Sequence, residues 1–150
     1  IERGKHIKAL SQSQGFSTQL RSEKKELDKN TEVYVADTMG EMGLWYSLSK
    51  AAFLGGSLVE KGGHNPLEAV QFGTFILHGS NISNAKEKYE QLKKIGVCFQ
   101  VSGEEEIAEK ILRLLNSNKK FDPEIDLSID TKTALKESFL AIKSALQENT

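Results

Sequence analysis

The sequence predicts an α/β fold in which a parallel sheet carries helices on both faces. Short apolar runs alternate along the chain with longer segments whose apolar residues recur at helical spacing. Glycines follow the helical segments, as at Gly15 and Gly73, where helices commonly end. Strands separated by helices favour parallel pairing, since a parallel connection needs a long crossover. A chain of 150 residues is long enough for one domain with a substantial core.

The apolar runs and the helical spacings give the expected elements in order. The expected strands are residues 16–20, 32–36, 51–54, 74–78 and 97–101. The expected helices are residues 1–14, a segment with Met42, Trp45 and Leu48 on one face, residues 66–72, residues 84–94 with Tyr89 and Leu92 inward, and a segment with Ile107, Ile111 and Leu114.

Two helix signals lie nearer the end of the sequence. Ser102 and Glu105 have the spacing of a capping box, which predicts a helix start there. A last helix is expected from the apolar stripe Leu135, Phe139, Ile142 and Leu146.

Composition excludes several classes of protein. Charged residues make up 27% and apolar residues 38%, which is typical of a globular chain. The formal net charge of −1 leaves no broad basic surface, so nucleic acid is not an expected ligand. The only cysteine, Cys98, lies in an apolar run, where we expect it to pack as a small hydrophobe on a strand.

The most informative segment reads GGSLVEKGGHNPLE and covers residues 55–68. It follows an expected strand and leads into a helix that Asn65 can cap, with Pro66 at the first helical position and Glu68 at the third. A strand, a glycine-rich loop and a helix N-terminus together make a site for an anion, since backbone N–H groups and the helix dipole face the ligand. The segment predicts a phosphate-bearing ligand.

A simpler interpretation explains only part of this segment. Asn65 and Glu68 alone can form a reciprocal helix cap, but that leaves four glycines, a serine and a histidine unexplained, so a ligand site is favoured. A second loop, residues 37–41, also follows a strand, and ligands of such folds bind beyond the carboxyl ends of strands. The alternative for this second loop is a plain turn with Asp37 or Thr38 as the cap.

Other motifs with known chemistry are absent from the sequence. It has no glycine pattern of a dinucleotide fold, no Walker lysine and no nucleophile elbow. It also has no Asp-x-Asp pair for a metal-bound diphosphate. Its three histidines, His6, His64 and His78, are scattered, so a metal site has little support.

At the two loops the chain resembles the 3-deoxy-D-manno-octulosonic acid (Kdo) transferases of lipopolysaccharide synthesis. The segments that carry the resemblance are ADTMGEM (36–42), FLGGSLV (53–59) and GGHNPLE (62–68). The resemblance covers about residues 33–101 and implies the C-terminal, donor-binding, Rossmann-like half of a GT-B glycosyltransferase. Residues 1–125 would form the donor domain and residues 126–150 its C-terminal helix. The N-terminal acceptor domain would lie outside this chain.

The resemblance also implies the ligands. The donor would be CMP-Kdo and the acceptor a lipid A precursor, with no metal or other cofactor and no catalytic residue in this part. The catalytic base and the association with the cytoplasmic side of the inner membrane would belong to the missing N-terminal part, so the fragment alone would bind weakly and catalyse nothing. The expected donor-binding residues are Met39, Gly40, Glu41, Ser57, Gly63, His64, Asn65, Pro66, Leu67 and Glu68.

Two alternatives stay open. The chain could belong to another GT-B nucleotide-sugar enzyme, either an epimerase or a different glycosyltransferase. It could also be a non-catalytic nucleotide-binding module. Titration with CMP, UMP and AMP would separate these possibilities, because a module without a nucleotide site would bind none of them.

Overall fold

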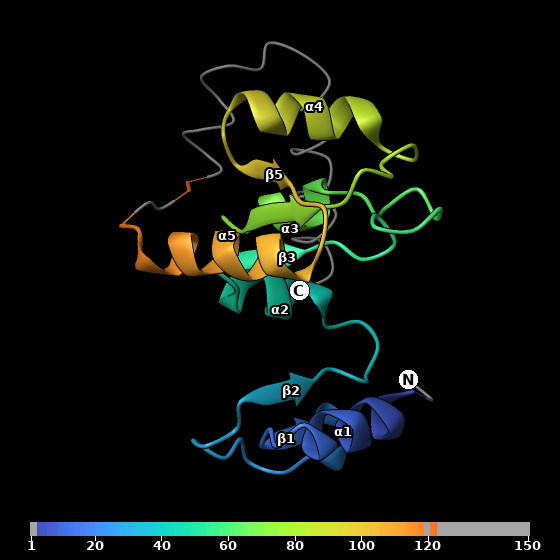
Figure 1. Ribbon diagram of the computed structural model, residues 1–150. Coiled ribbons are helices and arrows are strands. Elements are labelled where there is room, and N and C mark those ends of the chain that lie inside the picture. The colour runs from blue at the N-terminus through green and yellow to red at the C-terminus, as the bar shows by residue number, and fades with distance from the viewer. Residues whose placement is uncertain (1–2, 119–120, 123–150) are drawn as a thin grey trace. The chain divides into compact units, whose positions relative to one another are not determined.

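The computed structural model describes residues 3–118 and 121–122, and the chain forms two compact units that divide between Met42 and Gly43 (Figure 1). Each unit is built on parallel strands. The expected last helix, residues 126–150 with the stripe from Leu135 to Leu146, lies outside the described residues. The assignment of residues 1–125 to one donor domain stays a prediction.

The first unit contains two strands and two helical segments. Its elements are α1 (Gly4–Ser13), β1 (Thr18–Leu20), the 3-10 helix η1 (Arg21–Glu23) and β2 (Val33–Val35). β1 and β2 pair in parallel, with Thr18 opposite Val33. Gly4 is buried, and a Cβ at this position would lie 2.7 Å from the Asp37 side chain, so only glycine fits there. Asp37 in turn accepts hydrogen bonds from the Ser22 amide and hydroxyl.

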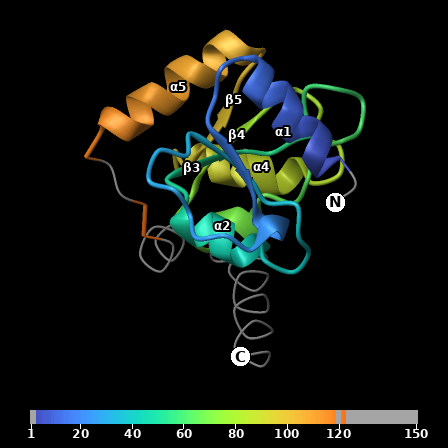
Figure 2. The ribbon, with the colours of Figure 1, turned by 90° about the horizontal axis from the view of Figure 1, so that it is seen from below.

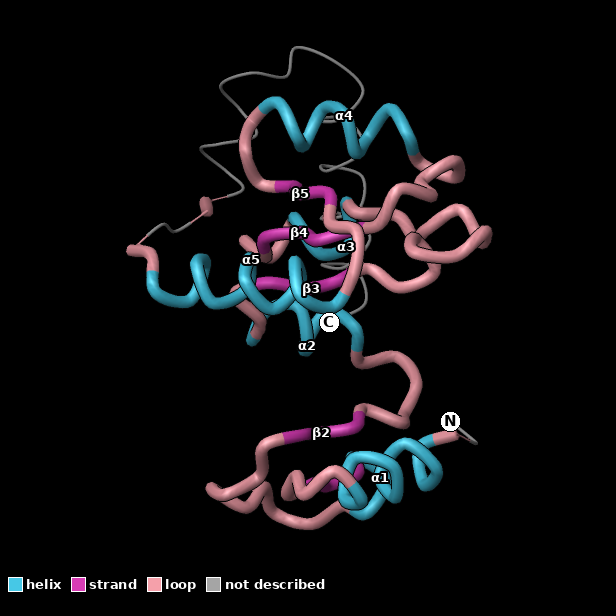
Figure 3. Tube along the Cα trace, in the orientation of Figure 1, coloured by secondary structure: helices cyan, strands magenta, loops and turns pink. Residues whose placement is uncertain are grey.

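The second unit is built on a three-stranded parallel sheet in the order β3-β4-β5, as Figure 3 shows. Its strands are β3 (Ala51–Phe53), β4 (Phe75–His78) and β5 (Cys98–Gln100). Its helices are α2 (Met42–Leu48), α3 (Leu67–Val70), α4 (Lys86–Lys94) and α5 (Glu104–Asn116). Figures 1 and 2 place α5 on one face of this sheet and α2 and α3 on the other, which confirms the predicted α/β arrangement.

The core of the second unit surrounds the central strand. All four residues of β4 are buried, as expected for a strand that is paired on both edges and covered on both faces. Tyr89 and Leu92 of α4 are 1% and 0% exposed, so their predicted inward orientation is confirmed. Cys98 is buried on β5, where it packs as the sequence predicted.

The helix α2 forms where expected, and its Met42 and Leu48 are 53% and 71% exposed. One local prediction needs correction. The predicted capping box at Ser102 and Glu105 is wrong by one residue. Gly103 is the N-cap of α5, and the Glu106 carboxylate accepts a hydrogen bond of 2.9 Å from the Ser102 amide. Three consecutive glutamates start this helix, and the third, Glu106, is the one whose side chain reaches back to the Ser102 amide.

Candidate nucleotide site

The glycine-rich loop runs from the end of β3 to the start of α3. Its glycines are required by the backbone, because Gly56, Gly62 and Gly63 have φ values of +73°, +79° and +70°. In this left-handed region a side chain is strained, whereas glycine is not. The glycines, which the sequence analysis took as a sign of close ligand approach, are therefore also needed for the backbone conformation of the loop itself.

Ser57 holds this loop from inside the protein. Its side chain is 0% exposed, and its hydroxyl donates to the Leu54 carbonyl at 2.6 Å and accepts from the Gly79 amide at 2.8 Å. The Asn81 amide donates to the Ser57 carbonyl at 2.8 Å. Ser57 thus ties the loop after β3 to the loop after β4. Its expected place on the phosphate side of the site stays a prediction.

Two residues of the α4 region hold the second half of the loop. Asn84 Nδ2 donates to the carbonyls of Lys61 and Gly63 at 3.1 and 3.2 Å. The Tyr89 hydroxyl donates to the His64 carbonyl at 2.7 Å. Sequence reasoning missed both roles, because these residues lie more than twenty positions from the carbonyls they contact and no local pattern links them.

The start of α3 differs from the prediction by one residue, because its N-cap is Pro66 and its first helical residue is Leu67. Asn65 Oδ1 accepts from the Leu67 amide at 3.3 Å, with Pro66 buried between them in helical conformation. The Glu68 carboxylate is exposed and accepts no hydrogen bond from any described residue, so the reciprocal half of the cap is not formed. The carboxylate is therefore free to contact a ligand.

Unpaired amides lie at the same place. The backbone N–H groups of His64, Asn65 and Glu68 donate no hydrogen bond within the described part of the chain. The His64 side chain is exposed, and Lys88 Nζ lies 3.4 Å from Asn65 Oδ1. Free amides beside a cationic side chain are what an anionic group requires.

The loop with Met39, Gly40 and Glu41 belongs to the first unit. Met39 is 79% exposed and Gly40 has a φ of +82°. The Glu41 carboxylate binds the Arg21 guanidinium through Nη2 at 2.7 Å and Nε at 3.1 Å, and also accepts from the Thr38 hydroxyl. Arg21 lowers the pKa of Glu41, so this carboxylate is ionised and already paired. That this loop shares a nucleotide with residues 65–68 stays a prediction.

His78 supports the site from the core. Its ring lies 4.5 Å from the ring of Tyr89, centroid to centroid, and its Nδ1 lies 2.6 Å from the Gly79 carbonyl oxygen. The side chain is 3% exposed, and burial lowers its pKa, which favours the neutral ring at neutral pH. His78 is therefore a packing residue and not a ligand contact.

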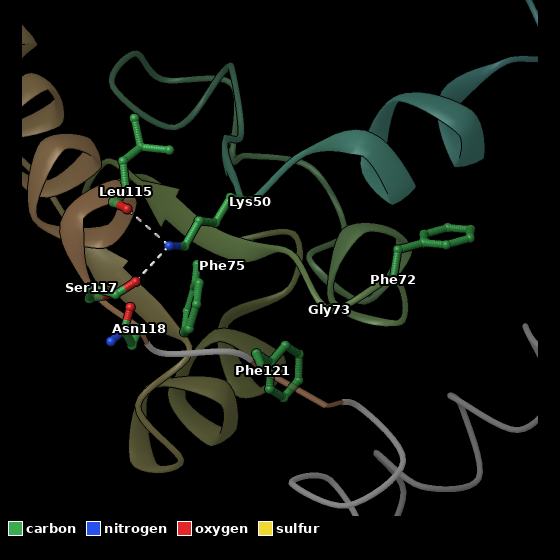
Figure 4. Close-up of a pocket in the computed structure, with 8 residues that line it drawn as sticks. All are labelled: Lys50, Phe72, Gly73, Phe75, Leu115, Ser117, Asn118 and Phe121. Carbon is green, nitrogen blue, oxygen red and sulfur yellow. Dashed lines mark hydrogen bonds between the residues drawn. The ribbon is translucent and has the colours of Figure 1, made fainter.

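A separate hollow of about 600 Å³ lies at the other edge of the sheet, where Lys50 and Gly73 precede β3 and β4 (Figure 4). Three of its eight lining residues are phenylalanines: Phe72, Phe75 and Phe121. Its one charged residue, Lys50, donates to the carbonyls of Leu115 and Ser117 at 3.2 and 2.7 Å. Lys50 therefore satisfies the end of α5, and among the described residues that line the hollow there is no other charged side chain.

The described residues contain neither a metal-binding cluster nor a candidate membrane span. No cluster of three or more His, Cys, Asp or Glu side chains there has the geometry to hold a metal ion. No helix among them has the length and apolar character that crossing a membrane requires.

Comparisons with known proteins agree with this geometry. Residues 11–124 match the family described as group 1 glycosyl transferases. The 3-deoxy-D-manno-octulosonic acid transferase of Haemophilus influenzae is 33% identical over 119 residues, which cover 79% of this chain and 28% of that protein. The transferase of the same name from Aquifex aeolicus is 32% identical over 124 residues, which cover 83% of this chain and 34% of that protein.

A solved structure supports the same family and also identifies the fold. The crystal structure of the C-terminal CMP-Kdo binding domain of WaaA from Acinetobacter baumannii superimposes with a TM-score of 0.71 at 30% identity, covering 76% of this chain and 60% of that chain. The chain thus spans about a third or less of the two curated relatives. Its α/β fold is that of the C-terminal half of a GT-B enzyme, and the chain belongs to the group 1 glycosyl transferases.

Proposed function

We propose that this chain binds CMP-Kdo as the donor half of a Kdo transferase, which moves Kdo to a lipid A precursor in lipopolysaccharide synthesis. The observation that carries the proposal is the 30% identity and TM-score of 0.71 with a CMP-Kdo binding domain. The acceptor, the catalytic base and contact with the cytoplasmic side of the inner membrane are assigned to polypeptide outside this chain.

The loop geometry supports this donor chemistry. The leaving group is the phosphate of CMP, which gains negative charge as the glycosidic bond breaks. The unpaired amides of His64, Asn65 and Glu68 can stabilise that charge, and they need no rearrangement to do so. We therefore propose a reaction that does not depend on a metal.

The exposed Glu68 carboxylate is suited to the ribose of the nucleotide. A carboxylate can accept two hydrogen bonds from a diol, and no described residue competes for its oxygens. Met39, Gly40 and Glu41 are proposed to contact the same nucleotide from the other loop. Among these residues Glu41 acts through its backbone, because Arg21 and Thr38 already hold its carboxylate.

Substitution of Glu68 by glutamine in the full-length enzyme tests the proposal. We expect the KM for CMP-Kdo to rise about tenfold, since a hydrogen bond to a charged group contributes about 1.5–3 kcal/mol. The melting temperature should stay unchanged, because the side chain that accepts from the start of α3 is Asn65, and the Glu68 carboxylate accepts no hydrogen bond from a described residue. Glu60→Gln, an exposed change in the same loop, is the matched control. An unchanged KM for Glu68→Gln would remove Glu68 from the donor site.

A different nucleotide-sugar specificity is the second candidate. A bifunctional glycosyltransferase/methyltransferase of Fusobacterium nucleatum is 31% identical over 106 residues, so not every related sequence is described as a Kdo transferase. Calorimetric titration of the full-length protein with CMP, UMP and AMP distinguishes the two. Our proposal requires CMP to bind at least about tenfold more tightly than UMP or AMP.

A further inference from the structure

We infer that Asn84 and Tyr89 are positioning residues that aim the amides of His64 and Asn65 at the donor phosphate. The inference rests on the proposed function, since it assigns to two further residues the shape of the same site. It goes beyond the predicted contacts because neither side chain has to touch the nucleotide.

Asn84 fixes three successive carbonyls of the glycine-rich loop. Its side-chain amide donates to the carbonyls of Lys61 and Gly63, and its backbone amide donates to the carbonyl of Gly62 at 3.1 Å. A Cβ at Gly62 would lie 2.5 Å from Asn84 Oδ1, so the Asn84 side chain occupies the space that the missing side chain leaves. Asn84 therefore contacts the loop at each of its residues from Lys61 to Gly63.

Because peptides are planar, these hydrogen bonds to carbonyls also fix the direction of the N–H groups that follow. In a planar trans peptide the carbonyl of one residue and the amide of the next point in opposite directions. Because Asn84 holds the Gly63 carbonyl, the His64 N–H points away from Asn84. Because Tyr89 holds the His64 carbonyl, the Asn65 N–H points away from Tyr89.

These are two of the amides that lack a partner in the described residues. The two anchors lie on the same side of the chain, so both N–H groups point to the opposite side, and successive amides that point the same way can together bind an anion. The two anchors thus hold donors in place before a ligand arrives, and a preorganised donor needs no rearrangement as charge develops.

Tyr89 is suited to this role because its ring is buried and packed. Its side chain is 1% exposed and its ring packs on His78. Burial raises the pKa of its phenol, so the hydroxyl stays protonated and remains a donor.

The test uses the full-length enzyme with the variants Asn84→Ala and Tyr89→Phe. Asn81→Ala is the matched control, because Asn81 lies in the same loop and its side chain makes no hydrogen bond to a described residue. We expect the Kd for CMP, measured by calorimetry, and the KM for CMP-Kdo to rise about tenfold in both variants. The KM for the lipid acceptor should stay at the wild-type value.

A merely structural role would reduce the amount of active enzyme, and hence kcat, and would leave both donor constants unchanged. Tyr89→Phe retains the buried ring and so keeps the test valid if Asn84→Ala folds poorly. Wild-type enzyme that binds CMP, together with variants that bind it equally well, would overturn the inference and leave the proposed function standing. Wild-type enzyme that does not bind CMP would overturn both.

Discussion

Replacement of Gly79 by alanine is expected to destabilise the second unit strongly. Gly79 is the first residue after β4, and a Cβ there would lie 2.5 Å from the Ser57 carbonyl carbon and 2.7 Å from the Leu58 amide nitrogen, with the Ser57 carbonyl oxygen also in contact. Ordinary contacts between such atoms are about 3.5 Å, so the loop backbone has to move by about 1 Å. The obstacle is backbone and cannot rotate away as a side chain could.

The size of the effect follows from two contributions. Overpacking of this kind costs about 1–3 kcal/mol. The same movement weakens the hydrogen bonds from the Gly79 amide to Ser57 Oγ and from the Asn81 amide to the Ser57 carbonyl, each worth about 0.5–1.5 kcal/mol. We therefore expect the free energy of unfolding to fall by about 2–5 kcal/mol.

Urea unfolding of the chain, followed by circular dichroism, measures this loss. Gly55→Ala is the matched control: a Cβ at Gly55 meets no atom within 4 Å, and no positive φ is required there. Its midpoint should stay close to that of the wild type. Equal midpoints for Gly79→Ala and Gly55→Ala would refute the reasoning that the two loops are locked together through Ser57.

Two further predictions concern buried titratable groups. Burial lowers the pKa of His78 in the folded chain, so as pH falls below about 6.5 the unfolded chain takes up a proton more readily than the folded chain, and the free energy of unfolding should decrease. Urea unfolding as a function of pH measures this decrease. His78→Gln should remove this part of the pH dependence, whereas His6→Gln, at an exposed position, should retain it. Burial raises the pKa of Cys98 to about 12, so its thiol should react slowly in the folded chain. A thiol reagent at pH 8 should therefore modify the unfolded chain rapidly and the folded chain hardly at all. Rapid labelling of Cys98 without denaturant would contradict its burial.

Much of the fold could be predicted from the sequence because its strands are short apolar runs bounded by glycine or polar residues. The five strands of the described residues lie within the expected ranges: the run 74–78 exceeds β4 by one residue at its start, and the run 97–101 exceeds β5 by one residue at each end. The 3-10 helix Arg21–Glu23 could not be predicted in this way. It consists of three polar residues, and one of its supports is an ion pair between Glu23 and Lys8 on α1.

The site could be predicted in part, for a related reason. The glycines and Asn65 are local signals, readable from spacing within one loop. The supports of that loop are not local: Gly79 and Asn84 come from the loop after β4, and Tyr89 comes from α4. The paired state of Glu41 likewise depends on Arg21, twenty residues earlier. Contacts of this kind follow from the tertiary fold and leave no pattern in a single sequence.

A crystal structure of the full-length enzyme with bound CMP tests the central claim most directly. We predict that the phosphate oxygens accept hydrogen bonds from the amides of His64 and Asn65, and that the ribose hydroxyls lie against the Glu68 carboxylate. CMP bound instead in the hollow beside Lys50 and Phe75, or a phosphate held away from residues 63–68, would contradict the claim that this glycine-rich loop is the donor site.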